Sequence, residues 1–415
     1  MRVRLKKYIF TLRRNNNEII TELLLASLLL FTIAPLMPKL YYPLGAVSYL
    51  LFIYAFFIKR WSLPFKSNTD IVYIFLLFII LLVILRPVLK FNLSEYRGQL
   101  LYPYGFLAHI LPFILLLRLH NISFPIVKRY LYIYGTIGIF FFIIDINTIF
   151  IDNTNLGFNE YQEYLFTISR SLTFLTAGLI VFFIPQFFSK KVKVLTIICF
   201  LLALFIQAFA ARRGGILLLL IILCFSLYLV LDKRYGFVTK GIIFVIVIAF
   251  ISILFYLVAD NFALLLERLD KDTRGVVEVY LYRSLDHNYT DWIFGRGLDG
   301  TYYFPIGDPE SFPDMNRGVI ETGYLYYILK GGLLYLFCYI VILLVAFIKG
   351  FFFSNNTLCK GMSLYILYNL ISLYPFGLPS FSFSTFILWL SVVWCMRSSC
   401  LKKTDMEVQT LFNSK

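Results

Sequence analysis

Apolar runs long enough to cross a membrane follow one another along almost the whole chain of 415 residues. A membrane-spanning helix needs about 20 mostly apolar residues, and a helix satisfies its backbone hydrogen bonds within one segment. The composition agrees, because 60% of the residues are hydrophobic, only 15% are charged and the mean hydropathy is +0.81. The sequence therefore predicts an all-α, polytopic membrane protein.

Windows of this kind predict about twelve transmembrane helices. The first six are Ile19 to Met37, Pro43 to Ile58, Ile71 to Leu89, Leu101 to Leu117, Leu131 to Phe150 and Tyr164 to Phe187. The other six are Val194 to Ala210, Gly214 to Leu231, Gly241 to Ala259, Tyr324 to Ile348, Gly361 to Tyr374 and Phe381 to Met396. We interpret the first run as a retained helix, because it is long and lacks a clear small-residue cleavage site.

The basic residues predict the orientation of these spans. Cytoplasmic loops are enriched in Lys and Arg, and here both termini and every second loop contain them. With both termini in the cytoplasm, the net charge of +15 divides into +18 on the inner side and −3 on the outer side. Basic residues scattered between apolar runs do not form the basic face of a nucleic-acid-binding module, so we expect no nucleic-acid partner.

One long soluble segment interrupts the spans on the predicted outer side. It divides the chain into residues 1–259 with nine spans, a large non-cytoplasmic loop at 260–323, and residues 324–415 with three spans and a cytoplasmic tail. The six cysteines fall in apolar runs or short flanks without zinc-type spacing, so neither a disulfide framework nor a zinc module is expected.

Arginine is unusually frequent among the basic residues placed outside. Ten of those 14 residues are Arg, against nine of 24 inside. Lysine would suffice for topology, whereas a guanidinium binds phosphate or carboxylate in a bidentate manner and stays charged at any depth. This choice predicts an anion-binding site at the outer leaflet, although single outer arginines can also contact lipid phosphates or pair with a loop carboxylate.

Two positions sharpen that prediction. Arg170 lies inside the sixth predicted span, where a charge is costly and usually faces a cavity, with Asp145 as a possible partner. Arg212 and Arg213 form a tight outer turn between two apolar helices, against the positive-inside bias. The glycines that follow, at 214 and 215, would let a ligand approach the backbone at a helix N-terminus.

The segment after residue 260 alternates acids, arginines and aromatic residues. Its candidate functional residues are Arg283, Asp286, His287, Asp291, Arg296, Tyr302, Tyr303 and Phe304. Aromatic faces can stack on sugar rings, and a carboxylate or imidazole can take a hydroxyl proton as a general base. This composition favours a sugar ligand, and a solvated loop would look similar.

The order of the motifs resembles the family of O-antigen polymerases and O-antigen ligases. The resemblance rests on Arg283, on the Gly-x-Gly element within Asp291 to Gly300, and on Glu321 to Leu336 leading into a span. The family pattern HNxYLxxLxxxGLxG aligns on Tyr324-Leu325 and Gly332-Leu333, which places Glu321 where ligases usually have histidine. Thr322 replaces the asparagine and Tyr335 the final glycine of that pattern.

Two further elements are similar to the family, and the glutamate favours its polymerase branch. The turn at Arg212-Arg213-Gly214-Gly215 looks like the family's arginine-containing turn, and Arg296 to Gly307 fits an Arg-x10-Gly pattern. The resemblance implies a C-type glycosyltransferase-like fold and metal-independent, inverting glycosyl transfer without a cofactor. It also implies undecaprenyl-pyrophosphate-linked oligosaccharide as the donor, the bacterial inner membrane as the location, and a possible chain-length regulator as a partner.

Such chemistry needs groups that stabilise the departing pyrophosphate and a base that deprotonates the incoming hydroxyl. We expect Arg170, Arg212 and Arg213 to bind the pyrophosphate, with Arg283 or Arg296 closing over it. Glu321 is the expected base, and His287 is the alternative. Tyr302, Tyr303 and Tyr324 are the expected glycan-binding residues.

Two other functions compete with a polymerase. An O-antigen ligase would share the fold and the donor but transfer finished polysaccharide to the lipid A core. A flippase or transporter of lipid-linked oligosaccharide is also compatible with twelve spans, although transporters tend to show internal repeats and polar residues near the midplane. The charges here gather toward one face, which favours an enzyme that works at one surface.

Overall fold

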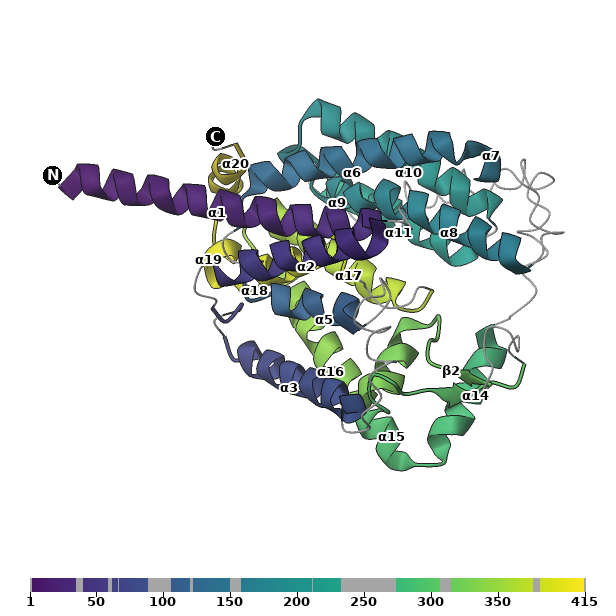
Figure 1. Ribbon diagram of the computed structural model, residues 1–415. Coiled ribbons are helices and arrows are strands. Elements are labelled where there is room, and N and C mark those ends of the chain that lie inside the picture. The colour runs from purple at the N-terminus through teal and green to yellow at the C-terminus, as the bar shows by residue number, and fades with distance from the viewer. Residues whose placement is uncertain are drawn as a thin grey trace. The chain divides into compact units, whose positions relative to one another are not determined.

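The protein is helical almost throughout (Figure 1). The structure is a computed structural model that describes residues 2–34, 40–58, 62–65, 67–88, 106–119, 122–149, 158–210, 212–232, 274–306, 315–375 and 381–413. The helices up to residue 187 are α1 (Arg2–Ile33), α2 (Tyr41–Phe57), α3 (Thr69–Val88), α5 (Phe106–Leu115), α6 (Phe124–Ile144), α7 (Ile146–Ile149), α8 (Phe158–Leu175), η4 (Thr176–Gly178), α9 (Ile180–Phe183) and η5 (Pro185–Phe187).

The remaining helices are α10 (Lys190–Phe209), α11 (Arg213–Asp232), α14 (Arg274–Asp286), α15 (Tyr289–Phe294), α16 (Gly323–Phe352), α17 (Thr357–Ser372), α18 (Phe383–Met396), α19 (Ser398–Leu401) and α20 (Asp405–Asn413). The described residues contain two strands, β1 (Tyr302–Tyr303) and β2 (Asn316–Arg317), which pair antiparallel with Tyr302 opposite Arg317.

Packing divides the chain into two compact units. The first contains residues 1–130 and 276–415, and the second contains residues 131–275. This division differs from the predicted one at 259 and 323, because the predicted boundaries follow the sides of a membrane and not the contacts between helices.

The centre of the first unit is α16, which packs against α3, α17 and α18 (Figure 1). An aromatic core lies where these helices meet α5. The ring of Phe113 is 5.3 Å from Trp389 and 6.0 Å from both Tyr335 and Tyr339, measured between centroids. Buried aromatic rings contribute large apolar areas and prefer tilted or edge contacts at such distances, so this cluster fixes the positions of α5, α16 and α18.

The second unit is built on α10, which packs against α8 and α11. On another side of α10, the thiol of Cys199 lies 3.5 Å from the carbonyl oxygen of Gly135 in α6. The predicted span from Tyr164 to Phe187 is interrupted here. Helix α8 ends at Leu175, and the short helices η4, α9 and η5 form the rest of the predicted span. Pro185, at the start of η5, lacks the N–H that a continuous helix needs.

Four described helical segments are long and apolar enough to cross a membrane: Thr69–Arg86, Phe124–Ile144, Lys190–Ala208 and Gly323–Phe352. Four shorter apolar helices are Tyr41–Phe57, Thr167–Phe183, Gly214–Leu229 and Phe383–Met396. Every predicted span falls wholly or partly on a described helix except Gly241 to Ala259, which lies outside the described residues. The described helices thus fit an all-α membrane protein, and the number of twelve spans stays a prediction.

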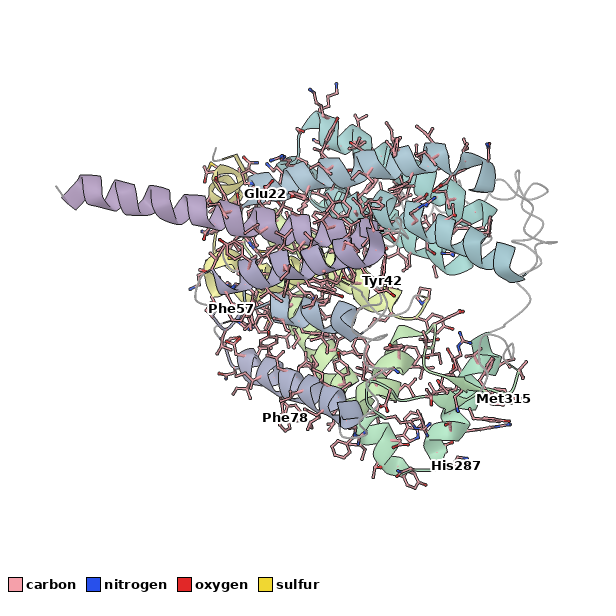
Figure 2. The ribbon with its side chains drawn as sticks, viewed as in Figure 1. Glu22, Tyr42, Phe57, Phe78, His287 and Met315 are labelled. Atoms are coloured by element: carbon pink, nitrogen blue, oxygen red, sulfur yellow. The ribbon has the colours of Figure 1, made fainter. Side chains whose placement is uncertain are left out.

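Large apolar side chains cover the outside of several of these helices. Phe57 of α2 is 71% exposed and Phe78 of α3 is 53% exposed (Figure 2). A soluble monomer rarely exposes extended apolar patches, whereas a helix that faces lipid does so throughout its span.

The predicted outer loop is a folded segment over the residues that the structure describes. Residues 274–306 and 315–322 contain α14, α15 and the β1–β2 hairpin, all within the first unit apart from the first two residues of α14. We call residues 274–322 the insert. Residues 260–273, the rest of the predicted loop, lie outside the described residues.

Candidate functional site

The insert is attached to α16 at a break in that helix. Gly332 has φ 74° and ψ −175° inside an otherwise helical segment, so the carbonyl groups of the preceding turn lose their helical partners. The backbone N–H of Arg296 donates to the carbonyl of Leu329 at 2.8 Å, and that of Gly297 donates to the carbonyl of Lys330 at 2.9 Å. The Gly-x-Gly element therefore replaces the hydrogen bonds that the break removes.

Glycine is required on both sides of this contact. A Cβ on Gly332 would lie 2.1 Å from the carbonyl oxygen of Ile293, and a Cβ on Gly295 would lie 2.5 Å from the backbone nitrogen of Gly331. Both glycines also have positive φ, which other residues adopt only with strain. The two glycine motifs noted in the sequence are thus the two halves of one backbone contact.

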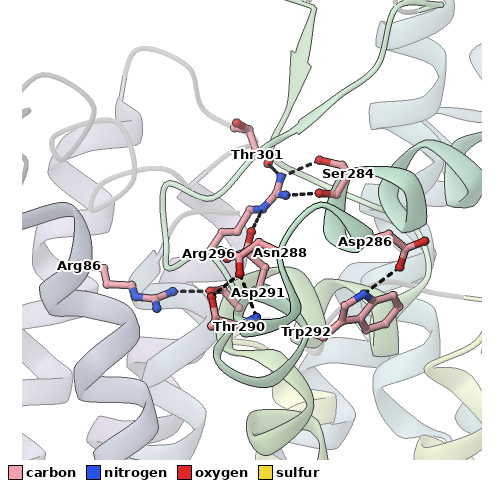
Figure 3. A network of polar contacts seen from close by, with 10 residues as sticks. Arg86, Ser284, Asp286, Asn288, Thr290, Asp291, Trp292, Arg296 and Thr301 are labelled. Carbon is pink, nitrogen blue, oxygen red and sulfur yellow. Dashed lines mark hydrogen bonds and ion pairs between the residues drawn. The ribbon is translucent and has the colours of Figure 1, made fainter.

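Two basic side chains reinforce the same contact. Lys330 of α16 is buried, and its Nζ donates to the carbonyl oxygens of Leu298 and Gly300, each at 2.8 Å. Arg86, at the end of α3, donates through Nη1 to the carbonyl of Gly295 (Figure 3). Both cations bind backbone carbonyls of the insert, which fixes the insert on α16 and α3.

Arg296 is a structural tie within the insert. Its Nε donates to Asp291 Oδ2 at 2.8 Å, its Nη1 donates to Ser284 Oγ and to the Thr301 carbonyl, each at 2.7 Å, and its Nη2 donates to the Ser284 carbonyl (Figure 3). An arginine has five N–H groups, and four hydrogen bonds are made here. Gly307, the other end of the Arg-x10-Gly pattern, lies outside the described residues.

Three other predicted residues of the insert, Arg283, His287 and Glu321, are exposed. Arg283 lies in the last turn of α14, His287 follows that helix, and Glu321 precedes α16 (Figure 2 labels His287). Neither Arg283 nor His287 forms a hydrogen bond or ion pair with another residue that the structure describes. These side chains are accessible to a ligand, in contrast to Arg296.

The two tyrosines of β1 point in opposite directions, as neighbours in a strand do. Tyr302 is buried, donates to the carbonyl of Val319 at 3.3 Å and packs on Phe304, whereas Tyr303 is 54% exposed. Burial raises the pKa of Tyr302 to about 12, with Arg317 lowering it and Glu321 raising it, so Glu321 and Arg317 both lie near this hydroxyl. Of the two, Tyr303 is the one with a ring open to a ligand.

Sequence reasoning missed Glu278, which lies beside the start of α16. The hydroxyl of Thr322, the residue before that helix, donates to Glu278 Oε1 at 2.5 Å. Glu278 and Tyr282 also both interact with the hydroxyl of Tyr324, a predicted glycan-binding residue. The signal that could have found Glu278 is its position four residues before Tyr282, on one face of a helix.

In the second unit, Arg170 is paired with Asp145. Asp145 lies in the turn between α6 and α7, and both of its oxygens accept from Arg170 Nε and Nη2. Ser171 Oγ donates to the same carboxylate at 3.1 Å, and the Arg170 guanidinium lies 5.2 Å from the centroid of Phe141. Asp145 is thus an arginine partner, which the sequence left open, and a bidentate pair of this kind orients the guanidinium precisely.

Arg212 lies in the turn before α11, with its Nη2 3.5 Å from Ser169 Oγ, the residue next to Arg170. The side chain of Arg213 lies outside the described residues. The sequence predicts that a ligand approaches the backbone of the glycines that follow. At Gly215 a side chain of the protein occupies this space, because a Cβ there would lie 2.2 Å from the buried Gln207 carboxamide.

The predicted site residues thus divide between the units: Arg170, Arg212 and Arg213 belong to the second, and Arg283, His287, Arg296, Tyr302, Tyr303, Glu321 and Tyr324 to the first. Within the described ranges, no three His, Cys, Asp or Glu side chains are grouped as metal ligands would be, and the metal-independent reaction stays a prediction. Comparisons with family models, curated proteins and solved structures return no significant match to this chain.

Proposed function

We propose that this chain is a surface-polysaccharide polymerase of the O-antigen type, which works at the outer face of the bacterial inner membrane. It transfers the growing glycan from undecaprenyl pyrophosphate to a lipid-linked repeat unit. The observation that supports this function best is the insert itself. It is a folded segment attached to a broken apolar helix, and it exposes an arginine, a glutamate and aromatic side chains.

The hydrogen bonds of the arginines refine their roles in this proposal. Arg283 has accessible donors, so it is the insert residue that we assign to the pyrophosphate, while Arg296 positions the Gly-x-Gly element. In the second unit, Arg212 and Arg213 remain predicted anion-binding residues of their own turn. Arg170 is held by Asp145 and supports the turn through its neighbour Ser169.

The reaction is a single inverting displacement. The acceptor hydroxyl loses its proton to Glu321 and its oxygen forms the new bond to the anomeric carbon of the donor sugar. The bond from that carbon to the pyrophosphate oxygen breaks, and undecaprenyl pyrophosphate leaves with the bonding electron pair. Positioned guanidinium groups stabilise the charge that develops on the leaving group. His287 is the alternative base, because it is also exposed.

One experiment distinguishes the polymerase from a ligase and from a transporter. The gene is deleted in its host, complemented with wild type, Glu321→Ala or Arg212→Ala, and the surface glycolipid is separated on a silver-stained gel. A polymerase deletion leaves core plus a single repeat unit, and neither variant restores the ladder. A ligase deletion leaves core without repeats and accumulates lipid-linked polymer. A normal ladder in the deletion would contradict glycosyl transfer and favour a transporter.

The arginine turn is tested by conservative substitution. We expect Arg212→Lys and Arg213→Lys each to lose long-chain polymer, because lysine retains the charge but cannot bind phosphate in a bidentate manner. Full-length ladders with both lysine variants would contradict the prediction that this turn binds an anion.

A further inference from the structure

Four aromatic side chains form two stacked pairs, one in the insert and one at the start of α16. Tyr282 of α14 and Trp292 of α15 are parallel within 9° at 6.0 Å between centroids, and Tyr324 of α16 and Tyr374 after α17 are parallel within 7° at 6.4 Å. The hydroxyl of Tyr324 interacts with Tyr282, which joins the two pairs. We call these four residues the aromatic ribbon.

The aromatic ribbon is accessible and flanked by carboxylates. Tyr374 is 61% exposed, and the other three rings are half-buried. Glu278 accepts from the hydroxyl of Thr322, two residues before Tyr324, at 2.5 Å. Asp286 accepts from Trp292 Nε1 at 3.1 Å (Figure 3). Each half of the ribbon therefore combines an open aromatic surface with a carboxylate at its edge.

Both ends of this surface are fixed by the fold. The backbone N–H of Gly323 donates to the carbonyl of Leu373 at 2.8 Å, which holds the start of α16 against the end of α17 and thereby places Tyr324 beside Tyr374. Trp292 is oriented by its hydrogen bond to Asp286. A preorganised aromatic surface binds a rigid ring without the entropic cost of ordering its own side chains.

We propose that the aromatic ribbon is a glycan subsite for the acceptor repeat unit, with pyranose rings lying on the aromatic faces and hydroxyl groups donating to Glu278 and Asp286. The electron-rich face of an aromatic ring attracts the polarised C–H groups on the apolar face of a pyranose. Carboxylates accept hydroxyl hydrogen bonds more strongly than neutral acceptors. The assignment to the acceptor rests on the proposed function, in which Glu321 takes the proton of the acceptor hydroxyl. Only one residue separates Glu321 from Gly323, where α16 begins, and Tyr324 follows directly.

An interfacial belt of aromatic residues that contacts lipid headgroups is the alternative. The contacts favour a glycan. Belt residues direct their polar groups to water and lipid, whereas Trp292 donates its indole N–H to Asp286 and the Tyr324 hydroxyl faces that of Tyr282. Two carboxylates beside the rings also disfavour anionic phosphates and favour a neutral polyhydroxylated ligand.

Ligand-observed saturation-transfer NMR on the full chain in nanodiscs tests the subsite. The probe is the lipid-free repeat unit released by mild acid from its undecaprenyl pyrophosphate carrier. Tyr374→Ala removes an exposed ring and should leave the fold intact. Tyr282→Ala removes one ring of the pair in the insert, and Tyr282→Phe keeps its face without its hydroxyl. The matched control is Tyr289→Ala, an 82% exposed tyrosine of α15 outside the ribbon.

We expect Tyr374→Ala and Tyr282→Ala to bind the probe about tenfold more weakly or worse, a loss of about 1.4 kcal/mol. Tyr282→Phe and the Tyr289 control should bind within about twofold of wild type. Wild-type affinity in both ribbon alanine variants, or no binding to wild type, would overturn the subsite.

The deletion gel separates this inference from the proposed function. A normal ladder in the deletion together with ribbon-dependent binding would overturn the polymerase but leave a glycan-binding surface. Loss of the ladder in the deletion, with normal ladders and normal binding in the ribbon variants, would overturn the subsite and leave the polymerase.

Discussion

The two Gly-Gly pairs of the chain look alike in the sequence but differ in the structure. Gly331-Gly332 breaks α16, with a positive φ at the second glycine and the backbone of the insert against it. Gly214-Gly215 continues α11 as regular helix, with the side chain of Gln207 against the second glycine. Only the first pair meets a rigid backbone, so only there does the fold depend on the absence of a Cβ.

The arginines of the two regions differ in a related way. Arg170 and Arg296 were predicted to bind the same pyrophosphate as Arg212, Arg213 and Arg283, yet both already have carboxylate partners, Asp145 and Asp291. The comparison teaches that an arginine beside an unusual turn can hold the turn through a carboxylate instead of binding a ligand. The predictions below separate these two roles.

Substitution of Gly332 should have the largest effect. Gly332→Ala places a methyl group against the Ile293 carbonyl in a strained conformation, and the free energy of unfolding should fall by about 4 kcal/mol. Gly215→Ala meets only a flexible side chain and should cost about 1 kcal/mol. Gly45→Ala has nothing within 4 Å and is the control. The thermal stability of the three variants is measured by heating each one and quantifying the folded protein by size-exclusion chromatography. An equal loss of stability at positions 332 and 215 would contradict the comparison.

Breaking the buried ion pair of the second unit should have the second-largest effect on stability. Arg170→Leu leaves Asp145 uncompensated, and we expect a loss of about 3 kcal/mol. The double variant Asp145→Leu, Arg170→Leu should recover most of that loss, because no unpaired charge remains. Thermal unfolding of the single and double variants measures the coupling. Additive losses in the two single variants would mean that the pair does not stabilise the turn.

The two insert arginines should separate stability from activity. Arg296→Lys loses most of its four hydrogen bonds and should cost about 2 kcal/mol. Arg283→Lys should leave the unfolding temperature unchanged and shorten the polymer, because its donors are open. Thermal unfolding and polymer ladders of both variants are compared. A destabilised Arg283→Lys, or a fully stable Arg296→Lys, would reverse the roles that we assign.

The β1 tyrosines should give the smallest difference. Tyr302→Phe removes a buried hydroxyl that donates to Val319 and should cost about 1 kcal/mol, whereas Tyr303→Phe should be neutral within about 0.5 kcal/mol. The measurement is again thermal unfolding of both variants. The opposite order would mean that the hairpin register differs from Tyr302 opposite Arg317.

Much of the fold could be predicted from the sequence, because hydropathy directly reports the apolar helices. The breaks were harder to predict. The hydropathy places Gly332 inside one span from Tyr324 to Ile348, since neither length nor hydropathy shows that a second segment supplies the missing hydrogen bonds. The insert was read as a loop because its helices, α14 and α15, are short and lack an apolar run.

Less of the site could be predicted. Residue type indicated which side chains can bind an anion or a sugar, but not which of them the fold already uses. The partners of Arg170 and Arg296 are 25 and 5 residues away, and nothing in their spacing distinguishes these arginines from Arg283. Glu278 was missed for the same reason, since its contact with Thr322 joins residues 44 positions apart.

Reconstitution with lipid-linked repeat units tests the central claim most directly. Folded wild-type protein in proteoliposomes is given the undecaprenyl-pyrophosphate-linked repeat unit, and chain length is measured by mass spectrometry, with Glu321→Ala as the matched variant. The account predicts that wild type elongates the glycan with release of undecaprenyl pyrophosphate and that the variant does not. Movement of the repeat unit across the membrane by wild type without elongation would contradict the account.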